Sequence, residues 1–231
     1  MRTCKRGSLN PSLPRLLQLA SPVLPVGAYT YSQGIEWVVE SGRVHDQDSA
    51  LAWIAALLEE GVGCFEGPLT AQLQRAWENS QHGEIARLNA DFLASRESSE
   101  LRAETVQMGY SLRRLLHELD DFAVPPAFDA LAELSFPVGW ALAAEVWKIP
   151  VADSLTAYLW SWCENQAMAA LKAVPLGQTA GQRILLALGS RLPAVVECAL
   201  ALPEERWSNF APGLALACSG HETQYTRLFR S

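Results

Sequence analysis

Three residues near the carboxyl end of the chain are of types that bind metal ions. Cys218 and His221 are three positions apart, a spacing that places both on one face of a helix, and Glu222 follows directly. A thiolate, an imidazole and a carboxylate together can bind a divalent metal. Most isolated Cys and His residues are not ligands, however. Cys218 and His221 are therefore candidate metal ligands, with a purely structural role as the alternative.

The sequence contains no further motif of a catalytic site. It has no Walker loop, no Rossmann glycine pattern and no GxSxG elbow, and His221-Glu222 lacks the second His of a zinc-protease helix. The other three His residues are isolated, and the paired carboxylates have the positions of solvated helix faces. We expect no catalytic residues and no enzyme activity.

A second group of polar side chains interrupts a long apolar stretch. Residues 151–188 carry almost no charge in their middle, and Pro175 must break any helix there because it removes a backbone donor and restricts Val174. Polar residues gather at this break, namely Lys172, Gln178, Thr179 and Gln182. They either satisfy the backbone groups that the proline frees or form a recognition site or a conduit.

The element that carries this group is expected to be the centre of the fold. Leu155, Leu159 and Trp162 follow helical spacing, and small residues at 167–173 leave the other sides nearly bare. A helix from Ala152 to Val174 would be about 34 Å long at roughly 1.5 Å per residue. Because it is apolar all round, other helices must cover it.

The remaining chain also favours helices. Stripes of helical period recur throughout, and no alternating segment of useful length predicts a strand. Thr30 and Gln33 fit a capping box, and Leu192-Pro193 is expected to start a separate helix. The prediction is an all-α, single-domain helical bundle of about ten helices around a central buried helix. Residues 1–12 are expected to be a mobile leader, and 13–231 the domain.

Two other segments are candidate contact surfaces. Pro25 and Gly27 lie in a constrained loop, and Tyr31 and Glu36 surround the helix entrance that follows, as a contact surface or as a local staple. The tail, about residues 214–231, ends in bulky apolar and basic residues. A free, solvated end has no need of such residues, so we expect the tail to dock on its own subunit or on another protein.

Composition limits the class of partner and the compartment. The formal net charge is −7 and the pI about 5.2, which argues against nucleic acid or an anionic membrane surface. Five scattered Cys residues without a CxxC, and no signal peptide, predict reduced thiols in the cytoplasm. No apolar run reaches the ~20 uninterrupted residues of a membrane span, although residues 174–189 come nearest.

Three collinear blocks resemble the signature blocks of the urease accessory protein F (UreF) family. They are LLQLASPVLPVGAYTYSQGIEWVVESGRV at 16–44, LKAVPLGQTAGQRILL at 171–186 and HETQYTRLFRS at 221–231. The resemblance covers nearly the whole chain after the leader. It implies an all-helical, homodimeric, cytoplasmic scaffold that is not an enzyme.

The resemblance also implies partners. The family acts with a UreD/UreH-type accessory protein and a UreG-type GTPase to deliver nickel to apo-urease. We therefore expect no tightly bound cofactor, with nickel in transit at most. Two alternatives are a regulator of the partner GTPase, because an arginine supplied in trans can stabilise a transferring phosphate, and a direct nickel-binding chaperone.

Particular residues match functional positions of the family. Arg227 matches the arginine that holds the tail in the geometry needed to recruit the GTPase. Trp160 corresponds to an aromatic residue on the GTPase-facing surface, but Thr156 stands where the family has a basic residue, which weakens that match. The expected partner-binding set is His221, Glu222, Tyr225, Arg227, Leu228, Phe229, Trp160, Lys172, Gln178 and Gln182. The loop with Pro25 and Gly27 is expected near the dimer surface.

Overall fold

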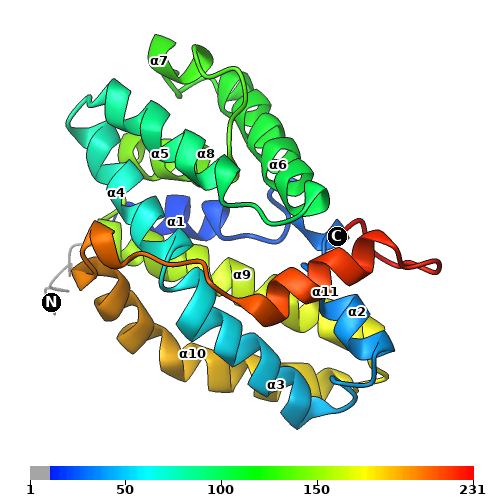
Figure 1. Cartoon of the computed structure of the whole chain (residues 1–231). Helices are drawn as coiled ribbons and strands as arrows, with labels where there is room; N and C mark the ends of the chain where they lie inside the picture. Colours follow the sequence, from blue (N-terminus) through cyan, green and yellow to red (C-terminus); the bar gives the residue numbers. More distant parts are fainter. Residues whose placement is uncertain (1–10) are drawn as a thin grey trace, which may run out of the picture.

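The centre of the molecule is a single buried helix. The structure, a computed structural model, describes residues 11–231, and within that range it contains helices and no strand. The central helix is α9 (Val151–Ala173) (Figure 1). It packs against α1 (Leu13–Leu19), α2 (Ile35–Glu40), α3 (Gln47–Ala56), α4 (Glu66–Glu78), α8 (Phe136–Val146) and α10 (Gln178–Ala201). The prediction of an all-α fold around a central helix is confirmed.

The other elements cover this centre from two sides. On one side α6 packs against α8, and α5 against α4; on the other, α11 lies across α2 and also touches α6 (Figure 1). Their bounds are α5 (His82–Ala94), α6 (Ser99–Glu118), α7 (Pro126–Asp129) and α11 (Pro212–Glu222). Short helices of other types complete the chain, namely the 3-10 turns η1 (Ala28–Thr30) and η3 (Glu204–Arg206) and the π-helical turn η2 (Leu57–Val62).

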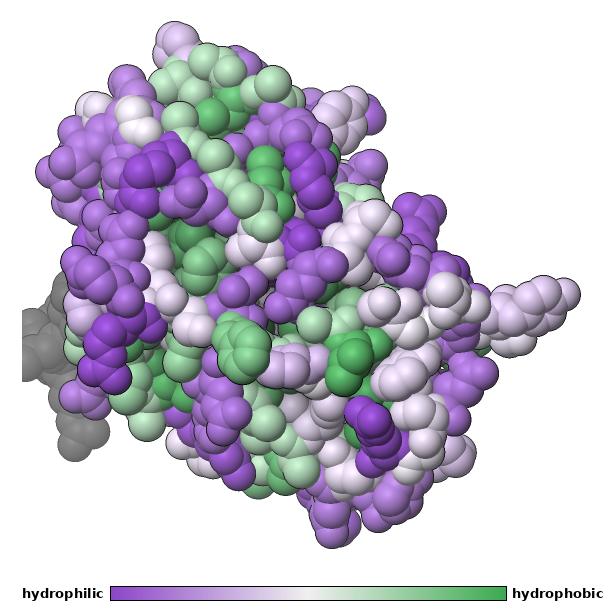
Figure 2. Space-filling model, viewed as in Figure 1, coloured by the Kyte–Doolittle hydropathy of each residue, from purple (hydrophilic) through white to green (hydrophobic). Residues whose placement is uncertain are grey.

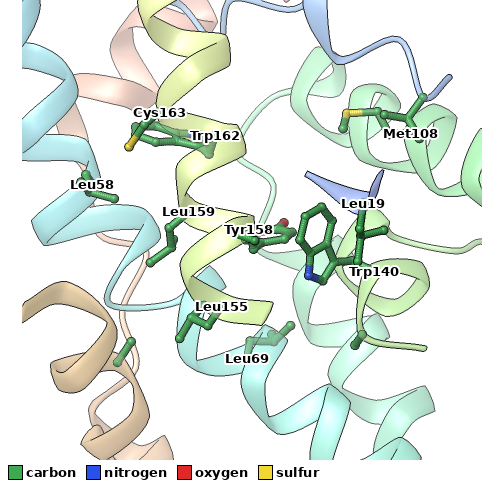
Figure 3. Packing of buried hydrophobic residues seen from close by; sticks show 14 of the residues in the cluster. Leu19, Leu58, Leu69, Met108, Trp140, Leu155, Tyr158, Leu159, Trp162 and Cys163 are labelled. Carbon is green, nitrogen blue, oxygen red and sulfur yellow. The ribbon is translucent and has the colours of Figure 1, made fainter. Parts of the chain in front are cut away.

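Aromatic packing fixes α9 to α8. Tyr158 of α9 packs against Trp140 and Phe136 of α8, with ring centroids 5.1 and 5.9 Å away. Figure 3 shows the contact of Tyr158 with Trp140. The Trp140 indole donates to Ser154 Oγ at 3.1 Å, so its polar nitrogen is satisfied inside the core. Leu155 and Leu159 are fully buried on the side facing α4 and η2, as the sequence stripe predicts.

The predicted break at Pro175 is confirmed. The central helix ends at Ala173, Val174 takes extended angles, and α10 begins at Gln178. This is the effect expected of a proline on the residue before it. The break lets α10 turn back along α9, so the two longest helices form one antiparallel pair.

The expected helix start at Pro193 is wrong. Pro193 lies inside α10, which runs unbroken to Ala201. A proline in a helix costs about 3 kcal/mol. Leu188, Leu192 and Val196 are buried on one stripe that spans the proline, and each such burial contributes about 1.5–3 kcal/mol. Packing on both sides of Pro193 therefore outweighs the lost backbone hydrogen bond.

The expected capping box at Thr30 and Gln33 is also wrong. Thr30 Oγ1 donates to the Gly27 carbonyl instead, and α2 begins only at Ile35, after Gly34 in a left-handed conformation (φ +77°). Gln33 itself has a positive φ of 51° and turns its side chain into the interior. Tertiary contacts of Gln33 replace the local cap.

α10 is the one helix in the described part of the chain that is long and apolar enough to cross a membrane, judged by length and composition. Only 33% of its most apolar 18-residue window is buried. Core helices of soluble proteins pass the same test, so this is weak support for a membrane span.

Gly109 is expected to be essential to the contact between α6 and α8. A Cβ at this position would lie 2.1 Å from the Leu134 carbonyl oxygen, which belongs to the backbone and cannot rotate away. Gly109→Ala should lower the free energy of unfolding by about 1–3 kcal/mol, as overpacking does. Urea denaturation measures this. Gly83→Ala is the control, because a Cβ there meets nothing within 4 Å, and equal stability of the two variants would contradict the prediction.

Candidate functional site

The carboxyl-terminal tail (residues 223–231) folds back over its own subunit. After α11 the chain makes a projecting turn, seen at the right of Figures 1 and 2, and returns beside the start of α6. Its last residues follow the segment before α2. Arg230 N donates to the Thr30 carbonyl at 2.9 Å, and Ser32 N donates to the Ser231 carbonyl at 2.7 Å. The tail thus docks, in large part, on its own body.

Glu36 is the principal anchor of the tail. It lies in the first turn of α2 with 6% of its surface exposed. Its carboxylate accepts from the backbone amides of Leu228 at 2.6 Å and Phe229 at 3.0 Å. Hydrogen bonds to an ionised acceptor are about twice as strong as neutral ones. One buried side chain therefore fixes two successive residues of the tail.

His221 joins this anchor to α6. Its ring is fully buried, with Nε2 3.3 Å from a carboxylate oxygen of Glu36 and Nδ1 2.7 Å from one of Glu100. Each ring nitrogen of His221 therefore contacts one carboxylate. Glu36, His221 and Glu100 form a chain of polar contacts from α2 through α11 to α6.

Arg227 connects the tail to the same network through Glu100. Its Nη1 donates to Glu100, its Nε to the Gln224 carbonyl at 2.8 Å and its Nη2 to the Glu222 carbonyl. The planar fork of a guanidinium group makes such contacts together, which a lysine cannot copy. Arg227 therefore holds the projecting turn in one shape.

Glu222 fixes α11 to the amino end of α6. Its carboxylate accepts from Ser99 Oγ at 2.6 Å and from the backbone N of Ser99 at 2.9 Å. These bonds, the Ser99 hydroxyl first, lower the pKa of Glu222. A carboxylate at a helix amino terminus also interacts favourably with the helix dipole. Glu222 contributes to the tail geometry through the body of the protein.

Glu104 binds the very end of the described chain. It is buried on α6 and accepts from Ser231 Oγ at 2.8 Å and from Gln33 Nε2 at 2.7 Å. The Gln33 oxygen in turn accepts from the Trp162 indole of α9 at 2.7 Å. Burial is the main cause that raises the pKa of Glu104 to about 7. This network connects the tail to the central helix.

Two exposed side chains of the tail are large and apolar. Tyr225 is fully exposed and Leu228 is 68% exposed, while Phe229 is buried with the Lys172 ammonium 5.3 Å from its ring centroid. Hydrophobic residues lie among hydrophilic ones on the face that carries α11 (Figure 2). Of the predicted tail residues, Tyr225 and Leu228 are therefore free to meet a partner, whereas His221 and Phe229 face the interior.

Four predicted partner-binding residues lie outside the tail, and of these only Lys172 contacts it, through the Phe229 ring. Lys172, Gln178 and Gln182 are exposed, so Gln178 and Gln182 do not line an internal conduit of this subunit, which corrects one interpretation of the break. Trp160 is half-buried beside Gly189 of α10. A role of these residues in partner binding stays a prediction.

The loop expected near a dimer surface is divided between surface and interior. Pro25 is exposed, and Gly27 adopts a left-handed conformation (φ +79°) that favours glycine. Tyr31 and Glu36 are buried within the subunit. Of the four residues predicted near a dimer surface, only Pro25 and Gly27 are therefore accessible at the surface of the folded subunit.

The predicted metal ligands are not brought together as a site. His221 already uses both ring nitrogens, and burial raises the pKa of the Cys218 thiol, which disfavours the thiolate that binds metals. Within residues 11–231, no three His, Cys, Asp or Glu side chains are grouped as metal ligands. The direct contribution of Cys218 and His221 to metal binding stays untested.

Sequence reasoning missed Glu100, Glu104 and Gln33. Glu104 shares one helix face with Leu101, Thr105 and Met108, which follow helical spacing in the sequence and are buried. A carboxylate on an apolar stripe indicates a buried partner, because an unpaired buried charge is costly. The position of Glu104 could therefore have indicated a buried partner from the sequence. For Gln33, nothing in the local sequence indicated its contacts with Glu104 and Trp162.

Replacing Glu36 should release the tail without unfolding the protein. In Glu36→Gln the amide has one acceptor oxygen and no charge, so the amides of Leu228 and Phe229 lose their shared carboxylate. A hydrogen bond to a charged group contributes about 1.5–3 kcal/mol, so exchange of these amides should accelerate by on the order of tenfold or more. Hydrogen–deuterium exchange measures it. Glu40→Gln, on the exposed face of α2, is the control, and unchanged tail protection would contradict the assignment.

Glu104 should make stability depend on pH. Its folded pKa of about 7 lies above the model-peptide value of 4.5, so the folded state binds the proton more tightly. Its contribution is therefore fully present below about pH 4.5 and is lost as the pH rises to about 7. The stability of wild type relative to the neutral Glu104→Gln should fall between pH 5 and 8 in urea denaturation. A constant difference across this range would show that Glu104 titrates normally.

Comparison of the sequence with known proteins identifies the family of the chain. The sequence model of the UreF family matches residues 44–189. The urease accessory protein UreF of Azoarcus sp. (strain BH72) is 61% identical over 100% of both chains, and that of Dechloromonas aromatica is 58% identical over 100% of both. UreF of Methylobacillus flagellatus is 51% identical over 95% of this chain and 98% of its own. The chain belongs to the UreF family of urease accessory proteins.

Proposed function

We propose that this protein is a non-catalytic scaffold that joins a UreD/UreH-type accessory protein to a UreG-type GTPase during nickel insertion into apo-urease. Family membership supports a part in urease maturation. The observation that carries the scaffold proposal is the tail, in which a buried polar network presents Tyr225 and Leu228 to solvent. Exposed apolar residues on a fixed backbone are typical of a binding surface.

The rigid base of the tail is what makes it suitable for recognition. Glu36, Glu100 and Glu104 hold it from two helices, so little conformational entropy is lost when a partner covers the exposed tip. The UreD/UreH-type protein is the partner proposed for this tip. A homodimer belongs to the same proposal, with the loop at Pro25 and Gly27 near its surface.

The surface around Trp160 is the proposed contact for the GTPase. Trp160 is half-buried on α9, about three turns from the exposed Lys172 end of the helix, and aromatic residues are enriched in interfaces. Thr156 is exposed one turn before it and supplies no charge. The proposed contact therefore depends on packing more than on an ion pair.

A role as GTPase regulator is the second candidate function. An arginine that acts on a phosphate must have free donors. Arg227 already donates from Nε, Nη1 and Nη2 within its own chain. These contacts favour an Arg227 that positions the tail over one that enters a nucleotide site. Regulation would then follow from how the assembled scaffold positions the GTPase.

Nickel is the proposed cargo of the assembled complex. A direct chaperone site at Cys218 and His221 is the less favoured alternative, because both side chains are buried and His221 would have to leave Glu36 and Glu100. The cytoplasm is the proposed compartment, in keeping with four free thiols among the described residues.

The exposed tip should determine partner binding. Tyr225→Ala/Leu228→Ala should weaken the complex with the UreD/UreH-type protein of the same urease by on the order of thirtyfold, since hot-spot residues contribute about 2 kcal/mol or more. Size-exclusion chromatography and biolayer interferometry measure this. The melting temperature should stay unchanged, because neither side chain is packed in the core. Tyr110→Ala/Leu186→Ala, exposed residues outside the tail, is the matched control. Binding equal to wild type in the tail variant would refute the proposal.

A further inference from the structure

A cavity of about 200 Å³ opens beside the tail. It lies between the loop of residues 20–29 and helices α6, α8 and α9. Its inner wall is aromatic, with Phe136, Trp140, Tyr158 and Trp162. Its mouth is formed by residues that are exposed, including Tyr29, Met168 and Lys172. The cavity thus runs from the core of the molecule to its surface.

The size of the cavity favours one side chain as its occupant. Sites for cofactors and drug-sized ligands are typically about 300–1,000 Å³. A cavity of about 200 Å³ is below that range and is comparable to one long amino-acid side chain. Apolar surface also continues outside the mouth, where Val23 is 84% exposed and Tyr29 is 64% exposed. A small molecule inside the cavity would leave this rim uncovered, whereas a protein surface would bury it.

The two basic residues that line the cavity both have partners in this chain. Arg96 is the cation of the inner wall, but it pairs with Glu66 at 3.2 Å, and Tyr158 donates to the same carboxylate. The Lys172 ammonium at the mouth faces the Phe229 ring and the Tyr29 carbonyl. These two cations are therefore already engaged.

Glu164 is the carboxylate without a counterpart. It lines the cavity on α9, half-buried, and has no hydrogen bond or ion pair with another residue in the range 11–231. Burial raises its pKa, which means that its charge has lost part of its hydration without compensation. Glu104, deeper in the cavity, accepts only from neutral donors, Gln33 and Ser231. A cation inserted here would meet the Glu164 carboxylate, which no base among residues 11–231 neutralises.

The geometry points to this cavity as a docking pocket for an arginine or lysine side chain, carried on an apolar segment of a protein partner. The aliphatic stem would lie along the aromatic wall, and the cationic end would reach Glu164. The overall charge of −7 also favours a partner with a basic surface. Because Glu104 and Lys172 contact both the cavity and the tail, the inference rests on the proposed function and assigns this pocket to the same UreD/UreH-type partner.

Photo-crosslinking identifies the occupant directly. A p-benzoylphenylalanine at Met168, in the full-length chain, should crosslink to the UreD/UreH-type protein on irradiation of the complex. Mass spectrometry should then find a crosslinked peptide with an Arg or Lys next to apolar residues. A crosslinked peptide without a basic residue, or one from a second copy of this chain, would overturn the inference.

Charge variants test the role of Glu164 separately. Glu164→Lys and the milder Glu164→Gln should each weaken binding of the same partner, by at least tenfold for Lys, with unchanged circular dichroism. Glu78→Lys, an exposed carboxylate on α4 outside the cavity, makes the same charge change and should bind as wild type does. If wild type binds the partner and both Glu164 variants bind equally well, the pocket is wrong and the scaffold proposal stands. If wild type itself fails to bind the partner, the proposed function fails and this inference fails with it.

Discussion

The carboxylate of Glu36 is the interaction on which the arrangement of the carboxyl-terminal region depends. Burying a charge is costly unless it is paired and hydrogen-bonded, and Glu36 is nearly inaccessible. Two tail amides and the His221 ring compensate it, and none of these groups belongs to its own helix. The tail is therefore more than a covering of α2, because without it the buried Glu36 side chain would keep only its contact with His221. Release of the tail removes two hydrogen bonds from a buried carboxylate, so the ordered tail is the favoured state of the folded body.

The central helix determines where this region can form. α9 packs against α8 and α10, and its Trp162 and Lys172 reach the tail network at Gln33 and Phe229. The turn at Pro175 returns α10 along α9 and leaves the other side of α9 to α2 and α1. The break at Pro175 therefore places α10 along one side of α9. The tail, the cavity and the loop around Pro25 lie on the other side.

Much of the fold could be predicted from the sequence, and the errors have a common cause. The helical period identified α9, and the effect of Pro175 on Val174 is local, so both predictions are correct. Pro193 and Gln33 were misjudged because buried packing and tertiary hydrogen bonds override local propensity there. For the candidate site, residue types indicated that the tail docks. They could not indicate on what, because Glu36 and Glu100 are far from the tail in sequence and only the fold brings them together.

The anchors of the tail also fix the number of residues in it. Between His221 and Ser231 the chain must meet Glu36, the Thr30–Ser32 segment and Glu104 in turn, with the intervening turn held by Arg227. A substitution at the solvent-facing tip leaves that path unchanged, whereas one residue added or removed would shift every later residue out of register with its anchor. The anchors thus restrict the number of residues in this segment as well as the identity of Arg227, Phe229 and Ser231. At the exposed tip, the side chains of Tyr225 and Leu228 can change to suit a different partner without altering the contacts that hold the tail.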